Sequence, residues 1–270
     1  MNLLVALVIV LATAAVAAGL MVLVRHRAGA PVLNDPTRAT TTLTMAGTAF
    51  AVLLAFITLA AFQTYNGAKD GADSEAAAVL TMFRTGALFP AQQRDELRGD
   101  LVCYGRAVVN QEWPAMGHSA SAPVVDRWIA AYRGLFSGLQ LHAAREQLAL
   151  QELLTDARNR TDGRQERLSE ATPSVPTPLW LVLVLGGVIA IVLQLAMADP
   201  RERLFVQASL VAGVAAIVAA GLLLVNFLDH PYTGHTGSIR PTQMERTLVM
   251  MRATEHGLRL PCGADGSPTT

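Results

Sequence analysis

The chain has 270 residues, of which 52% are hydrophobic and only 16% are charged, and its mean hydropathy is +0.37. Soluble domains carry about 25% charged residues, so this composition argues against an ordinary water-soluble protein. The charges of the 21 basic and 21 acidic residues cancel, so the net charge gives no reason to expect a nucleic-acid partner, and we expect none. Lys69 is the only lysine, and such a bias toward arginine and alanine is typical of bacterial genomes rich in G and C.

Four uncharged segments dominate the hydropathy pattern. They cover residues 3–24, 43–62, 179–198 and 204–228. Each has about the 20 residues that a helix needs to cross about 30 Å of hydrocarbon. The first is longer than the apolar core of a signal peptide and follows no basic flank, so we expect it to be a retained helix. The pattern predicts an all-α integral membrane protein with four transmembrane helices in two hairpins.

The same segments divide the chain into four parts. These are a first transmembrane hairpin, a water-exposed helical domain, a second hairpin and a water-exposed tail, at residues 1–62, 63–177, 178–228 and 229–270. In the helical domain, Leu97, Leu101 and Tyr104 recur at helical spacing. The Gly, Ser, Pro and Thr residues near the end of the tail predict a disordered terminus.

The basic residues near the membrane predict an orientation. The two short loops within the hairpins carry five of them, namely Arg25, Arg27, Arg38, Arg201 and Arg203. The opposite flanks carry four, namely Lys69, Arg164, Arg167 and Arg240. Because basic residues in short loops favour the cytoplasm, this count places the hairpin tips inside the cell and both termini outside, by a small margin.

Cys103 and Cys262 are the only cysteines, and both fall on the same side of the membrane in either orientation. If that side is oxidising, the two residues can form a disulfide. The simpler expectation is two unpaired thiols, with Cys103 on a packed helix face and Cys262 in a loose tail.

Motifs that carry chemistry are missing. The sequence has no nucleophile elbow, zinc-protease helix, phosphate-binding loop, dinucleotide-binding glycine pattern or C-x-x-C motif. Asp229, His230 and His235 are residue types that bind metals, but their spacing matches no standard site. We therefore expect no catalytic residue, no metal, no cofactor and no enzymatic activity. The spans contain no Asp, Glu, His or Lys, which argues against proton-coupled transport.

The second span carries a stripe of small and weakly polar residues at helical spacing. This stripe consists of Thr44, Thr48, Ala51, Ala55, Thr58 and Phe62. Such a face can line a narrow pore that closes by dewetting. It can equally pack against another membrane helix, because small residues and threonine are common at helix contacts in membranes.

Four segments together resemble the bacterial bestrophin-like family. They read GTAFAVLLAFITLAAFQTY from Gly47, DSEAAAVLTMFR from Asp73, NQEWPAM from Asn110 and LDHPYTG from Leu228. His230 departs from the pattern, since family members typically have a basic residue there. The acidic calcium-binding clasp of the animal proteins has no match, so the resemblance does not imply calcium gating.

The resemblance implies a homo-oligomeric anion channel, because bestrophins line their pore with apolar and aromatic residues of the second helix. The pore-lining candidates in this sequence are Thr44, Thr48, Phe50, Phe56, Thr58 and Phe62, with the three phenylalanines as candidates for a constriction. Bestrophins keep both termini and the helical domain in the cytosol, which conflicts with the orientation predicted from the arginine count.

We therefore expect a multi-pass protein of the plasma membrane that forms a homo-oligomer in the lipid bilayer and conducts chloride or other small anions. The alternative is a membrane-anchored scaffold or sensor whose helical domain binds a partner without conduction. A ring of subunits with the second span around its axis favours the channel. A monomer, or a two-fold dimer with sealed helices, favours the scaffold.

Overall fold

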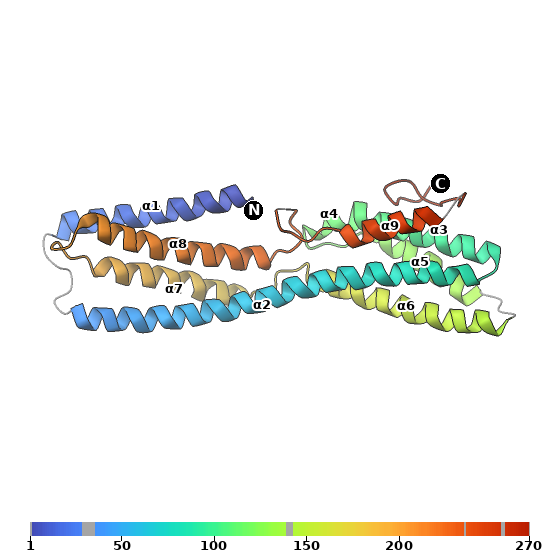
Figure 1. The fold of residues 1–270 in the computed structure, drawn as a ribbon, viewed down its shortest axis with the longest axis horizontal. Coiled ribbons are helices and arrows are strands. Elements are labelled where there is room, and N and C mark those ends of the chain that lie inside the picture. The colour runs from blue at the N-terminus through green and yellow to red at the C-terminus, as the bar shows by residue number, and fades with distance from the viewer. Residues whose placement is uncertain (1, 29–35, 139–142, 235, 255–256, 270) are drawn as a thin grey trace. The chain divides into compact units, whose positions relative to one another are not determined.

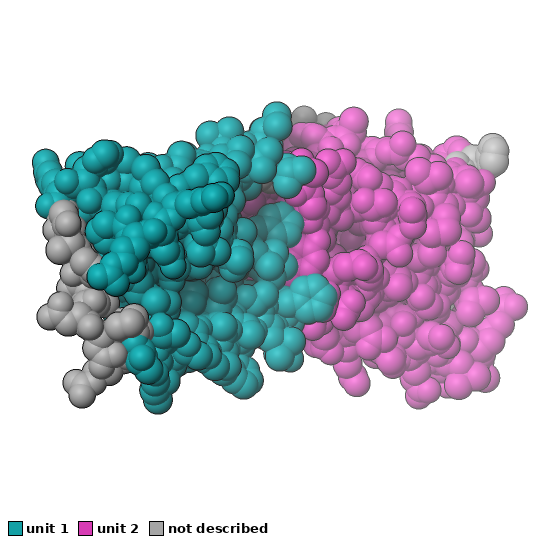
Figure 2. Space-filling view, turned by 60° about the vertical axis from the view of Figure 1, so that its left-hand side comes forward, with its two compact units in different colours: residues 1–64, 173–229 teal, residues 65–172, 230–270 magenta. Residues whose placement is uncertain are grey.

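The structure is a computed structural model that describes residues 2–28, 36–138, 143–234, 236–254 and 257–269. Every regular element within these ranges is a helix, and one isolated bridge joins Cys262 to Pro268. The predicted all-α fold class is therefore confirmed. The chain forms two compact units (Figure 2). Unit 1 comprises Met1–Thr64 and Pro173–Asp229, and unit 2 comprises Tyr65–Thr172 and His230–Thr270.

Among its described residues, unit 1 contains four helices that are long and apolar enough to cross a membrane (Figure 1). They are α1 (Leu3–Ala28), the first part of α2 (Pro36–Thr85), α7 (Thr177–Ala196) and α8 (Leu204–Leu228). Each coincides with one of the predicted spans, although α7 ends at Ala196 rather than at 198. The continuous helix α2 leaves unit 1 after Thr64 and continues into unit 2.

Apolar clusters hold the four helices of unit 1 together. One cluster joins α1 to α8 and includes Ala17, Met21, Val211 and Ala215. A second joins α2 to α7 and α8 and is built around Ile57, Leu183 and Val225. Many apolar side chains on the other faces of these helices are exposed, as expected for helices that contact lipid or further membrane helices.

Unit 2 is a group of helices around a large apolar core, with a smaller apolar cluster that includes Ala68, Met116 and Tyr232. In chain order they are the rest of α2, η1 (Gly86–Leu88), α3 (Ala91–Ala107), η2 (Val108–Glu112), α4 (Trp113–Met116), α5 (Pro123–Gly138), α6 (Ala144–Ser169) and α9 (Thr242–Thr254). Of these, η2 is a π-helical turn that follows α3 directly, and such turns are frequent at functional sites. It ends at Glu112, whose side chain is buried.

The C-terminal segment belongs to unit 2 and packs against α3 and α5, so the predicted disorder is wrong for residues 257–269. Trp128 Nε1 donates a hydrogen bond to the Gly266 carbonyl at 2.8 Å, and Arg106 Nη1 donates one to the Gly263 carbonyl at 2.9 Å. Gly266 has a φ of +82° and lies against the backbone of Ala107, where a side chain has no room. The composition of the segment correctly indicates little helix, but side chains of α3 and α5 hold its backbone in place.

Cys103 and Cys262 form a disulfide, so the expectation of two unpaired thiols is wrong. Their Cα atoms lie 5.8 Å apart, and both residues are buried. Cys103 lies on α3 in the core of unit 2, and Cys262 reaches it from the C-terminal segment. Their separation of 159 residues in the sequence concealed this proximity.

Candidate functional site

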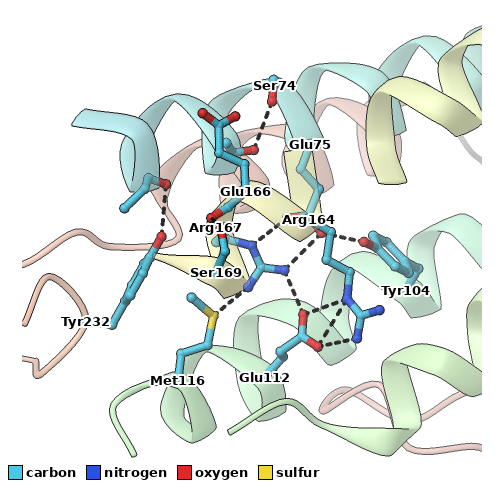
Figure 3. Close-up of polar contacts among 12 residues, drawn as sticks. Ser74, Glu75, Tyr104, Glu112, Met116, Arg164, Glu166, Arg167, Ser169 and Tyr232 are labelled. Carbon is cyan, nitrogen blue, oxygen red and sulfur yellow. Dashed lines mark hydrogen bonds and ion pairs between the residues drawn. The ribbon is translucent and has the colours of Figure 1, made fainter. Parts of the chain in front are cut away.

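Four charged side chains meet in the interior of unit 2 (Figure 3). We call Glu75, Glu112, Arg164 and Arg167 the charge cluster. Glu75 comes from α2, Glu112 from the π-helical turn η2, and the two arginines from α6. A spacing of three residues puts Arg164 and Arg167 on the same side of α6, so one helix supplies both cations.

Arg167 is the centre of the charge cluster. Its Nε lies 2.5 Å from Glu75 Oε2, and its Nη2 lies 2.7 Å from Glu112 Oε2. Arg164 Nη2 lies 2.6 Å from Glu112 Oε1, while Arg164 Nη1 pairs with the exposed Asp126 at 2.7 Å. Both glutamates and Arg167 are fully buried. Each buried carboxylate therefore has at least one guanidinium partner, as buried charges require.

Glu112 and Arg167 are held in their charged forms. Burial by itself would raise the pKa of Glu112, but hydrogen bonds and charge from Arg164 and Arg167 outweigh burial and lower that pKa below its ordinary value. Burial would lower the pKa of Arg167, but Glu75 and Glu112 raise that pKa above its ordinary value. A general acid or base needs a pKa near neutrality. Neither Glu112 nor Arg167 meets that requirement, so the geometry indicates a structural ion-pair network.

Residues from the motifs that resemble bestrophins converge on Arg167. Its Nη1 contacts the sulfur of Met116, and its Cζ lies 5.3 Å from the centroid of the Trp113 ring. Trp113 packs edge-to-face on Tyr232, at 5.5 Å between ring centroids, and the Tyr232 hydroxyl donates to the Ala68 carbonyl at 2.9 Å. Three motifs that are far apart in the sequence therefore surround one arginine.

Sequence reasoning missed the arginines of this cluster. In the sequence, Arg164 and Arg167 stand out only as basic residues near the membrane. Glu75 and Glu112 were part of the quoted motifs but had no assigned partner. Two acidic residues inside motifs, together with two arginines three residues apart in a helix, were the available signal. Nothing in the sequence shows which of the many arginines approaches them.

Two glycines allow α2 and α6 to approach closely at the charge cluster. A Cβ added at Gly71 would lie 2.8 Å from the backbone nitrogen of Arg167. One added at Gly163 would lie 2.7 Å from the backbone nitrogen of Glu75. Gly71 lies inside the continuous helix α2, at the point where α6 packs against it. The short distance between the backbones is what lets Arg167 reach Glu75.

We predict that Gly163→Ala lowers the free energy of unfolding by about 1–3 kcal/mol, because the added methyl group forces apart two packed backbones. Thermal unfolding of the purified protein in detergent measures the change. Gly134→Ala is the matched control, since nothing lies within 4 Å of a Cβ at this exposed helical position. Alanine there should leave stability unchanged or raise it slightly. An equal change in the free energy of unfolding for the two variants would contradict the close approach of the α2 and α6 backbones.

The second candidate site is the outward face of α2 in unit 1. Thr44 and Thr48 are exposed, and Phe56 and Phe62 are 67% and 47% exposed. Thr58 is half-buried and donates its hydroxyl to the Leu54 carbonyl at 2.7 Å. Phe50 packs inside the unit, because a Cβ at Gly186 would lie 2.6 Å from its ring. The structure thus brings four of the six candidates to the exposed surface of α2, and their role in a pore remains a prediction.

The stripe predicted on α2 lies largely on this exposed face. Thr44, Thr48, Ala51, Ala55 and Phe62 are all exposed. The Thr44 hydroxyl donates its hydrogen to the Thr40 carbonyl at 2.8 Å, so this hydrogen bond is satisfied within α2. The face is therefore only weakly polar, and it makes few contacts within the chain.

The sequence matches the profile of the Bestrophin-like domain over residues 10–244, which is most of the chain. The chain belongs to the Bestrophin-like domain family. This match confirms the resemblance. It includes most of the first span, the whole of the other three, and both carboxylates and both arginines of the charge cluster. A comparison with curated proteins finds no match.

The Bestrophin-like fold is confirmed by comparison with solved structures. A mutant of a bacterial Bestrophin homolog from Klebsiella pneumoniae matches with a TM-score of 0.66 and 14% identity, over 90% of this chain and 98% of that one. A second crystal structure of that homolog matches with a TM-score of 0.64 and 15% identity, over 93% and 99% of the two chains. At such low identity the likeness concerns the fold alone.

Metal-ligand residue types do not form a site in the part of the chain that the structure describes. No group of three or more His, Cys, Asp and Glu side chains in these residues could hold a metal ion. Asp229 instead accepts backbone hydrogen bonds from Ser174 and Val175, at 2.7 and 3.0 Å. Asp229 thereby fixes the segment that leads into α7. His235 lies outside the described residues.

Proposed function

We propose that this Bestrophin-like protein is a homo-oligomeric channel for chloride or other small anions in the plasma membrane. The observation that carries the proposal is the exposed stripe of α2, on a membrane-spanning helix of a chain that belongs to this family. Bestrophins line their pore with the corresponding helix.

The physical character of the stripe supports this role. Copies of α2 around a symmetry axis would place threonine and alanine side chains along a narrow path, with a ring of Phe62 side chains at one level. Such a path contains no fixed charge to trap an ion, and an apolar ring can close it by excluding water. The α2 residues of unit 1 that face other helices, such as Phe50 and Ile57, are already packed within the chain. This leaves the stripe available for contacts between subunits.

We predict that purified protein in liposomes conducts chloride and that Phe62→Ala raises the flux several-fold, because the substitution widens an apolar constriction. A chloride-sensitive dye inside the liposomes measures the flux. Phe205→Ala is the matched control, since Phe205 is an aromatic residue of α8 that is 83% exposed and lies on another helix. The control should conduct like the wild type.

Absence of chloride flux at every voltage and ionic gradient would refute the channel. Equal flux through the wild type and both variants would leave conduction standing but would remove Phe62 from the constriction.

A scaffold or sensor is the second candidate, and a groove in unit 2 favours it. The groove has a volume of about 680 Å³, and its lining includes Glu96, Asp100, Leu135 and Leu258. Burial, together with the charge of Glu96, raises the pKa of Asp100 to about 6.

The oligomeric state separates the two candidate functions. A ring with α2 around its axis supports the channel, and a monomer supports the scaffold.

A further inference from the structure

The side of the membrane that unit 2 faces can be inferred from the chemistry of its cysteines. Cys103 and Cys262 both belong to unit 2 and are bonded to each other. Disulfides persist in oxidising compartments, whereas glutathione and thioredoxin keep thiols reduced in the cytosol. A structural disulfide in this unit therefore favours a location outside the cytoplasm.

The disulfide is an integrated part of unit 2. Both cysteines are members of its buried apolar core. Directly after Cys262, the segment is held by side chains of neighbouring helices: Arg106 and Trp128 donate to the carbonyls of Gly263 and Gly266, and Gln111 Nε2 donates to the Asp265 carbonyl at 3.1 Å. These contacts hold the residues that follow Cys262 against α3, η2 and α5. The pairing is thus a consequence of how the whole segment folds.

The distribution of basic residues gives a second, independent argument. The sequence alone set five basic residues at the hairpin tips against four on the other side. Two of those four, Arg164 and Arg167, lie inside a folded domain and pair with Glu112 and Glu75. The positive-inside rule, by which basic residues favour the cytoplasmic side, counts only loops of up to roughly 60 residues, because longer domains cross the membrane largely regardless of charge. Tyr65–Thr172 is much longer than this limit, so neither arginine should count.

Without Arg164 and Arg167, the count of basic residues clearly favours the hairpin tips as the cytoplasmic side. The hairpin tips keep Arg25, Arg27, Arg38, Arg201 and Arg203, and the other side keeps Lys69 and Arg240. Lys69 also belongs to the long domain, which weakens that side further. The basic residues at the two hairpin tips, in the last turn of α1, the start of α2 and the segment between α7 and α8, are therefore the strongest cytoplasmic signals in the chain.

We propose that unit 2 lies on the extracytoplasmic, oxidising side of the membrane, with the two hairpin tips in the cytoplasm. This is the reverse of the bestrophin arrangement, in which the helical domain is cytosolic. The orientation does not depend on conduction, because a channel or a scaffold could adopt it. Its consequence is that any solute or partner that binds unit 2 acts from outside the cytoplasm.

Two single-cysteine reporters test the orientation in intact cells. Ser121→Cys places a thiol at an exposed position of unit 2, and His26→Cys places one at an exposed position near a hairpin tip. The native cysteines stay in place, because a disulfide does not react with maleimide. We expect a membrane-impermeant maleimide to label Ser121→Cys in intact cells and to label His26→Cys only after lysis. Labelling of His26→Cys in intact cells, with Ser121→Cys protected until lysis, would overturn the proposal.

A measurement on the unmodified protein avoids any effect of the reporters on folding. Cells are quenched with a permeant alkylating reagent, and the masses of the peptides that contain Cys103 and Cys262 are then determined. We expect a disulfide-linked pair without alkylation. Recovery of both cysteines as alkylated thiols would show that unit 2 resides in a reducing compartment and would overturn the proposal.

Discussion

Replacing Arg167 with alanine is expected to lower the free energy of unfolding by about 3–5 kcal/mol, because it leaves buried charge without a partner. Arg167 bonds both carboxylates of the charge cluster. Without it, Glu112 retains Arg164, but Glu75 retains only the hydroxyl of Tyr104 among the contacts in the cluster. The loss should therefore exceed the effect of removing Arg164, which is partly exposed and leaves Arg167 in contact with both glutamates.

Thermal or denaturant unfolding in detergent measures the effect of Arg167→Ala. Arg94→Ala is the control, because Arg94 pairs with Asp95 at the surface of unit 2, where water already solvates both charges. The control should unfold like the wild type. If Arg167→Ala also unfolds like the wild type, water reaches the carboxylates, and the cluster is not the buried network described above.

Removing the disulfide is expected to cost about 2–5 kcal/mol of stability and to release the C-terminal segment. In the chain-entropy account, a crosslink restricts the unfolded chain more when it closes a longer loop. The bond between Cys103 and Cys262 spans a separation of 159 residues, which puts the expected effect toward the upper part of this range. Cys262→Ser should therefore unfold at a lower temperature and be cleaved near residue 257 by protease earlier than the wild type.

Reductant supplies the control for the disulfide experiment. Unfolding in the presence of reductant should bring the wild type down to the stability of Cys262→Ser and should leave that variant unchanged. If the variant and the wild type unfold alike without reductant, the hydrogen bonds from Arg106 and Trp128 are sufficient to hold the segment, and the disulfide contributes no stability.

The sequence predicted the transmembrane architecture because hydrophobic length is a local property. A run of about 20 apolar residues must form a helix in the bilayer, where its backbone groups can only bond within the segment. This reasoning located α1, α2, α7 and α8 without any knowledge of their neighbours. It also located the stripe of Thr44, Thr48, Ala51, Ala55 and Phe62, because side chains on one face of a helix follow from its period alone.

Which side chains of α2 pack against other helices and which stay exposed was less predictable. Phe50 and Phe56 look equivalent as aromatic residues of one apolar segment. Only the packed structure shows that Phe50 fills the space left by Gly186, while Phe56 stays exposed. The difference depends on a glycine in another helix, which periodicity cannot reveal.

The charge cluster and the disulfide were decided by tertiary structure alone. Glu75 and Arg167 are separated by 92 residues, and Cys103 and Cys262 by 159. Local sequence determines that each of these side chains is polar or reactive, but not which partner it meets. The partner depends on how closely α2 and α6 approach at Gly71 and Gly163, and on where the last segment crosses α3. Such long-range contacts exist only once the whole unit is packed, so the sequence could supply the residues of the site but not their pairing.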